Sequence, residues 1–158
     1  MEFDYLGILF RWLHILAAIV AIGGMAFCRL ALMPALRTLD SEQRQQIHEA
    51  IRARWSKVVA GSIGLLLISG LYNIFATIKA PYYADLPRYY IHAFAVKFVL
   101  ALGIFFIASA LSGRGKATEK IRQNGGFWLT VNLLLALLLV CISGVLRMSH
   151  HGANIPLE

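Results

Sequence analysis

The sequence is poor in acidic residues, cysteine and proline. Its 158 residues include eight Asp and Glu, two Cys and four Pro. The two cysteines, Cys28 and Cys141, fall at opposite depths of two different apolar segments, so we expect no disulfide between them. A P-loop, a Ser-His-Asp pattern and a Cys pair spaced for zinc are also missing from the sequence. Hydrolysis of the kind that soluble enzymes perform therefore has no support.

Long apolar runs dominate what is present. Hydrophobic residues make up 59% of the chain and charged residues 15%, whereas about half of a soluble domain is apolar. Four segments, at about 5–27, 58–78, 89–111 and 127–146, each supply the roughly 20 mostly apolar residues that a membrane span needs. We predict an all-α integral membrane protein, a bundle of four transmembrane helices that forms one domain over residues 1–158 and contacts the lipid bilayer.

The net charge of +7 is concentrated in two connections, 29–57 and 112–124. Basic residues that flank spans indicate orientation rather than nucleic-acid binding, and they favour the cytoplasmic side. We therefore predict a multi-pass protein of the bacterial inner membrane with both termini periplasmic. Within the first connection, 41–54 predicts an amphipathic cytoplasmic helix, capped by Asp40 or Ser41, that leads into the second span, and Pro34 marks the exit of the first span.

The spans contain a repeated pattern. The stretch WLHI at 12–15 is matched by YIHA at 90–93, and LISGL at 67–71 by CISGV at 141–145. Two matches in the same order predict a duplicated pair of helices, a 2+2 tandem repeat. The repeat would place His14 and His92 at the same depth, in the half of the bundle near the termini.

Five ionisable residues interrupt the spans. Each costs several kcal/mol in hydrocarbon, so each is expected to be functional or to face the bundle interior. The five are Arg11, His14, His92, Lys97 and Arg147. A stripe at helical spacing, which predicts an inward face of the first span, consists of Arg11, His14, Ala18, Ala21 and Met25. A polar stripe of the second span, expected opposite it, consists of Ser62, Ser69, Asn73 and Thr77.

Two histidines on facing helices favour haem b, because its iron accepts two axial imidazoles. We therefore predict His14 and His92 as ligands of the haem iron. Arg11 and Arg147 are candidate partners of the propionates, although basic side chains near helix ends also extend to the headgroups. Lys97 is a candidate partner for a propionate, a substrate carboxylate or a lipid phosphate. The alternative for each histidine is a hydrogen bond to a neighbouring helix.

The tail supplies a second, weaker set of metal ligands. Met148, His150 and His151 have side chains that bind copper or zinc, but their spacing is not diagnostic and also fits a solvated tail. A copper-handling protein that passes the ion inward through these residues, His14 and His92 is the alternative function. A structural membrane subunit is a third.

The stretches RWLHILAAIVAIGGMAFCRLALMP, IRARWSKVVAGSIGLLLISGLY and IHAFAVKFVLAL resemble the HemJ-type protoporphyrinogen oxidases and the related CopD copper-resistance domains, over nearly the whole chain. The resemblance implies a haem b protein that oxidises protoporphyrinogen, with His14 and Lys97 at the positions associated with haem and activity. Lys97 is then the candidate catalytic residue. Two features depart from the family: CRLAL at 28–32 replaces a proline-containing stretch, and Ala95 stands where a histidine is usual.

Together these patterns predict a haem b membrane redox protein that oxidises a tetrapyrrole or exchanges electrons with a quinone. They do not identify the substrate, and they do not decide whether the protein forms a homo-oligomer.

Overall fold

The computed structural model describes residues 4–79, 88–113 and 115–152, without the side chains of 88–91 and 146–152. The elements in chain order are α1 (Tyr5–Phe27), the π-helical turn η1 (Cys28–Leu32), α2 (Met33–Leu36), α3 (Ser41–Lys79), α4 (Arg88–Ser112), the 3-10 turn η3 (Lys116–Thr118), α5 (Glu119–Gln123) and α6 (Gly125–Gly152). The described residues form four helical segments that are long and apolar enough to cross a membrane. The predicted all-α fold with four membrane helices is confirmed.

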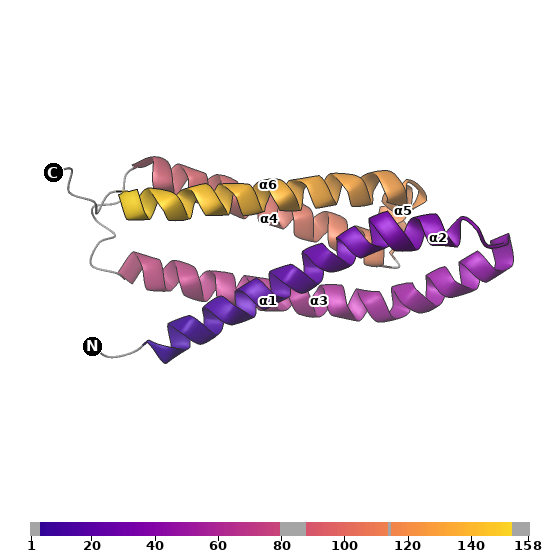
Figure 1. Cartoon of the computed structure of the whole chain (residues 1–158), viewed down its shortest axis with the longest axis horizontal. Helices are drawn as coiled ribbons and strands as arrows, with labels where there is room; N and C mark the ends of the chain where they lie inside the picture. The colour runs from indigo at the N-terminus through magenta and orange to yellow at the C-terminus, as the bar shows by residue number, and fades with distance from the viewer. Residues whose placement is uncertain (1–3, 80–87, 114, 153–158) are drawn as a thin grey trace.

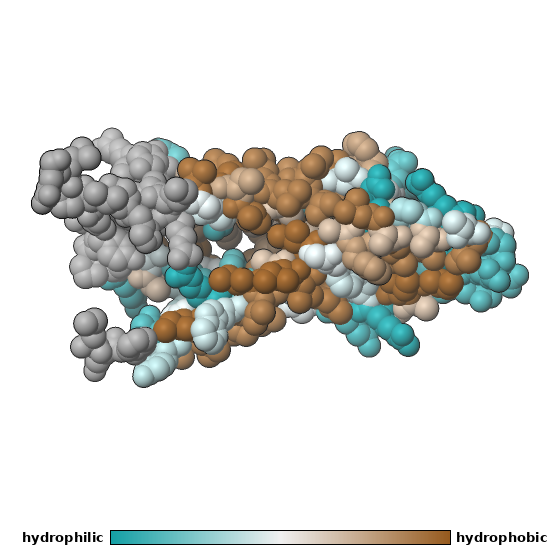
Figure 2. All heavy atoms as spheres, in the orientation of Figure 1, coloured by the Kyte–Doolittle hydropathy of each residue, from teal (hydrophilic) through white to brown (hydrophobic). Residues whose placement is uncertain are grey.

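The four long helices form two hairpins. Helix α1 packs chiefly on α3 and α4 chiefly on α6, with α3 and α4 making the main contact between the hairpins. In Figure 1, α1 and α4 run in one direction and α3 and α6 in the other, so α1 begins and α6 ends at the same end of the bundle. We call this the terminal end and the opposite one the basic end. The pairing fits the predicted tandem repeat, and Figure 2 shows an apolar belt between the two ends.

Helix α3 is much longer than a membrane span. Its 39 residues correspond to about 58 Å at ~1.5 Å per residue, roughly twice the thickness of the hydrocarbon core. The first part of α3 therefore projects from the bundle at the basic end, as Figure 1 shows. The backbone N–H of Gln43 donates to Asp40 Oδ1 over 2.8 Å and caps the helix. The predicted helix at 41–54, its Asp40 cap and its continuation into the second span are confirmed.

The helix of the first span continues past its proline. Helical structure runs from α1 through η1 and α2 to Leu36, with Pro34 at the second position of α2. Proline lacks an N–H and is tolerated in the first turn of a helix. The π-helical turn immediately before α2, which ends with the Met33 N–H donating to the Cys28 carbonyl, resets the hydrogen-bonding register there. That Pro34 marks the exit of the span from the membrane stays a prediction.

The hairpins are joined near the basic end by two side-chain hydrogen bonds between the first span and α6. Asn132 on α6 is fully buried, and its Nδ2 donates to Met25 Sδ over 3.0 Å. Arg29 Nε donates to Thr130 Oγ1 over 2.6 Å. An amide in hydrocarbon gains from any such partner, because the alternative is an unsatisfied polar group. These bonds hold α1 against α6 at one level of the bundle only.

Gly24 allows α1 and α3 to pack closely. A Cβ atom on Gly24 would lie 1.9 Å from Trp55 Cη2, which is far inside contact distance. Replacing Gly24 with alanine therefore requires the indole to rotate or the hairpin to open. We expect Gly24→Ala to lower the free energy of unfolding by about 1–3 kcal/mol, as overpacking usually does. Equilibrium unfolding in mixed detergent micelles measures the effect.

Gly23 provides the matched control for this prediction. A Cβ atom there meets no other atom within 4 Å. Gly23→Ala should therefore be neutral or slightly stabilising, because alanine is the better helix former by about 0.8–1 kcal/mol. Shortening the indole in Gly24→Ala/Trp55→Leu should recover part of the loss. Equal effects of the two glycine substitutions would show that the contact with Trp55 is unimportant.

Candidate cofactor site

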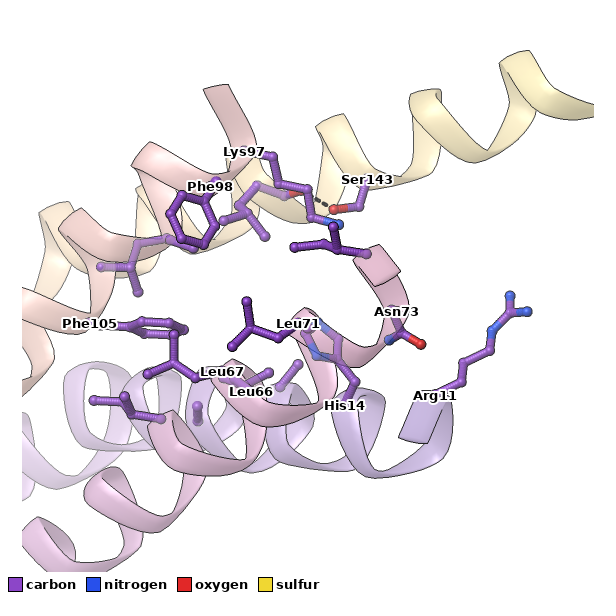
Figure 3. Close-up of a pocket in the computed structure, with 18 of the residues that line it drawn as sticks. Arg11, His14, Leu66, Leu67, Leu71, Asn73, Lys97, Phe98, Phe105 and Ser143 are labelled. Carbon is purple, nitrogen blue, oxygen red and sulfur yellow. Dashed lines mark hydrogen bonds between the residues drawn. The ribbon is translucent and has the colours of Figure 1, made fainter. Parts of the chain in front are cut away.

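A cavity of about 970 Å³ lies between the two hairpins and is lined by all four long helices. This volume is at the upper end of the range of roughly 300–1,000 Å³ that is typical of small-molecule and cofactor sites. Most of its walls are Leu, Ile, Phe and Ala side chains. The polar lining residues are few: Asp4, Arg11, His14, Asn73, Thr77, Lys97 and Ser143. Figure 3 shows Arg11, His14, Asn73, Lys97 and Ser143 coming from different helices, next to the apolar residues Phe98, Phe105 and Leu67.

His14 extends from α1 into this cavity and is held by α3. Its Nδ1 lies 2.8 Å from Ser69 Oγ, and Ser69 is only 1% exposed. The Ser69 hydroxyl also donates to the Leu65 carbonyl of its own helix, so its single proton is committed. We therefore assign His14 Nδ1–H as the donor to Ser69 Oγ. In this tautomer Nε2 carries the lone pair, as in a metal-binding histidine that is oriented by a neighbouring oxygen.

The glycine that follows Ser69 in α3 also lies beside the His14 ring. A Cβ atom on Gly70 would lie 3.6 Å from His14 Cε1. Gly70 thus brings the backbone of α3 against the imidazole. At the corresponding glycine of α6, Gly144, a Cβ atom would meet nothing within 4 Å. The two Ser-Gly pairs of the predicted repeat therefore have different surroundings.

Lys97 approaches the cavity from α4, on the wall opposite His14, as Figure 3 shows. It is half-buried and forms no hydrogen bond or ion pair with the described residues. Ser143 lies on the same side, with its hydroxyl donating to the Leu139 carbonyl over 2.7 Å. Arg11 is exposed at the terminal end and points away from both groups.

The charges that line the cavity are mostly positive. Among the described lining residues, the one carboxylate is Asp4. Asp4 sits at the rim, where its Oδ1 accepts a hydrogen bond of 2.8 Å from the Gly7 N–H and caps α1. Lys97 therefore faces an apolar cavity without an adjacent acid inside it, and Arg11 lies exposed at the terminal end of the cavity. Such a cavity is complementary to a molecule that has an apolar body and anionic groups.

The stripe predicted for the first span is confirmed. Its five residues, Arg11, His14, Ala18, Ala21 and Met25, all line the cavity. The second stripe was expected to lie opposite, and it does so through Asn73 and Thr77, which line the cavity, and through Ser69, which contacts His14.

The structure does not bring His92 to His14. The His92 side chain is exposed and is not among the residues that line the cavity. The two histidines lie on different faces of their helices. His14 and His92 are 78 positions apart in the sequence, whereas residues of α1 and α4 that both line the cavity are 83 positions apart. The pairs at this separation are His14 and Lys97, Ala18 and Ala101, Ala21 and Ile104, Ile22 and Phe105, and Met25 and Ala108. Lys97 is thus the positional counterpart of His14.

The remaining predicted site residues lie in the last turns of α6. The side chains of Arg147, His150 and His151 are outside the part of the chain that the structure describes. Over the described residues, no three His, Cys, Asp or Glu side chains gather as they would around a metal ion. Cys28 and Cys141 are both free thiols.

Asn132 is the polar residue that sequence reasoning missed. It is a lone amide in an otherwise apolar span, which is the signal that could have marked it as an interior residue. Its Oδ1 is buried and has no hydrogen-bond partner among the residues that the structure describes. Asn132 lies behind Met25, which lines the cavity, so it supports the wall of the cavity nearest the basic end.

Comparison of the chain with protein-family models, curated proteins and solved structures finds no match.

Proposed function

We propose that this protein binds haem b in the cavity between its two hairpins and acts as a membrane redox protein. The observation that carries the proposal is the histidine of α1. The imidazole of His14 lines the cavity and is fixed through Nδ1 by Ser69. Nε2 of an imidazole whose other nitrogen donates to an oxygen is a common ligand of haem iron.

The rest of the cavity fits the same group. Haem b has an apolar macrocycle and two carboxylates, and the lining combines apolar walls with the cations of Lys97 and Arg11. When bound, the haem would supply one-electron redox chemistry. The chain's own residues bind the iron through His14, orient that ligand through Ser69 and neutralise carboxylates. Because His92 lies outside the cavity, each chain would supply one imidazole, that of His14, to the iron.

The partner in this reaction would be a lipophilic molecule. The two hydrogen bonds that join the first span to α6 lie toward the basic end, and Figure 1 shows α1 diverging from α6 toward the terminal end. A quinone or a tetrapyrrole dissolved in the bilayer could therefore reach the cavity sideways between these helices. The redox step would be electron exchange with such a quinone, or oxidation of such a tetrapyrrole with a quinone as the acceptor of its electrons, with Lys97 positioned to hold a substrate carboxylate.

The proposal is tested by the absorption spectrum of the purified protein titrated with haem. We expect saturation at one haem per chain, with a Soret band that shifts and sharpens when the protein is reduced. The second candidate function, copper handling, predicts a preparation that stays colourless with haem and binds copper stoichiometrically. A structural subunit predicts that neither binds, and either of these results would refute the haem proposal.

A further inference from the structure

A second site, distinct from the cavity, lies at the basic end, where α3 passes the last turn of α4. A groove there is lined by Ala53, Arg54, Ser56 and Lys57 of α3 and by Ser112 and Gly113 at the end of α4. We infer that this groove binds the phosphate headgroup of an anionic lipid. The inference is independent of what occupies the cavity.

The position of the groove matches the headgroup layer. Lys57 and Lys79 bracket the apolar part of α3 and are 22 residues apart, which is about 33 Å at ~1.5 Å per residue and close to the ~30 Å of a hydrocarbon core. Lys57 therefore lies at one edge of the bilayer. Helix α4 ends at Ser112, beside it. A lipid whose acyl chains lie along the bundle would have its phosphate at this level.

The charge in the groove is positive and uncompensated. Arg54 and Lys57 are exposed, and neither forms a hydrogen bond or an ion pair with the described residues. The acidic residues earlier in α3 are engaged elsewhere, since Glu42 accepts a hydrogen bond from Gln46 and Glu49 accepts one from Gln45. Basic pockets between membrane helices at the headgroup level are typical of sites for anionic lipids.

The hydroxyl groups do not supply the anion site. Ser56 Oγ donates to the Ala53 carbonyl and Ser112 Oγ donates to the Ala108 carbonyl, so the donors left for a phosphate belong to the cations. The end of α4 carries partial negative charge, which would repel an anion. Arg52 offsets this charge, because its guanidinium donates to the Gly113 carbonyl and also ties α3 to α4 beside the groove.

The test is retention of lipid by the full chain, measured by native mass spectrometry after purification in detergent with added phosphatidylglycerol or phosphatidylcholine. We expect the native protein to retain phosphatidylglycerol preferentially. The double variant Arg54→Gln/Lys57→Gln should bind it about 30-fold more weakly, from the loss of two cations at the surface. Circular dichroism checks that the variant remains helical.

One matched variant and one competitor complete the test. Arg44→Gln removes a cation from the projecting part of α3, about 15 Å beyond Arg54. This variant should retain phosphatidylglycerol like the native chain. Millimolar inorganic phosphate should not displace the lipid. An equal loss in Arg44→Gln, equal retention of the two lipids, or displacement by inorganic phosphate would overturn the inference.

Discussion

Replacing His14 with alanine is expected to abolish stoichiometric haem binding. The imidazole is the only histidine of the described chain that lines the cavity, and Ser69 already orients it for ligation. Loss of a residue that merely orients a ligand lowers metal affinity about 10–100-fold, so loss of the ligand itself should exceed about 100-fold. Haem titration followed at the Soret band measures the change in Kd.

Three further variants separate ligation from other roles. His92→Ala removes the exposed histidine of α4 and should bind haem like the native chain. Ser69→Ala keeps the imidazole but removes its acceptor, and should weaken binding about 10–100-fold. Adding free imidazole to His14→Gly should restore the native spectrum. Native affinity in His14→Ala, or an equal requirement for His92, would show that His14 alone does not hold the iron.

The membrane topology of this chain could be predicted from sequence because its signal is long and strong. Four apolar runs of about 20 residues predict membrane-spanning helices, because a helix satisfies all of its backbone hydrogen bonds within lipid. The inward face of α1 could be predicted for the same reason. One arginine, one histidine and two alanines at a spacing of three or four residues mark a face that would be costly to expose to lipid.

The partners of those residues could not be predicted. That His14 meets Ser69, and that Gly24 meets Trp55, depends on the crossing of α1 over α3. A crossing of two helices is set by the packing of many small contacts, none of which has a sequence signature of its own. The sequence places Ser69 in a polar stripe, but only the structure identifies it as the residue that contacts the imidazole of His14.

The repeat shows how a correct pattern can give a wrong register. The two hairpins are present, yet the faces of α1 and α4 correspond at 83 residues, which puts Lys97 rather than His92 opposite His14. A shift of five residues rotates a helix position by about 140°. The matching aromatic-x-His letters therefore lie on different faces, because short matches in apolar sequence carry no information about helix rotation.

Replacing Lys97 with methionine is expected to weaken haem binding and to stabilise the empty protein. Lys97 is half-buried in an apolar cavity without a partner among the described residues, so it disfavours the fold until an anion arrives. We expect Lys97→Met to raise the free energy of unfolding without haem by about 1 kcal/mol, less than the roughly 3 kcal/mol of a lysine at the centre of a membrane helix. Haem affinity should fall about 10–100-fold, the value of one charge-assisted hydrogen bond.

The dimethyl ester of haem isolates the cause of this loss, because its propionates carry no charge. The native protein should bind the ester about as weakly as Lys97→Met binds haem, and Lys97→Met should not weaken ester binding further. Such non-additivity is what a direct pairing of the ammonium with a carboxylate requires. Lys79→Met, which removes an exposed lysine outside the cavity, should leave both affinities unchanged. If Lys97→Met weakens haem and ester binding equally, the lysine shapes the cavity and does not pair with a carboxylate.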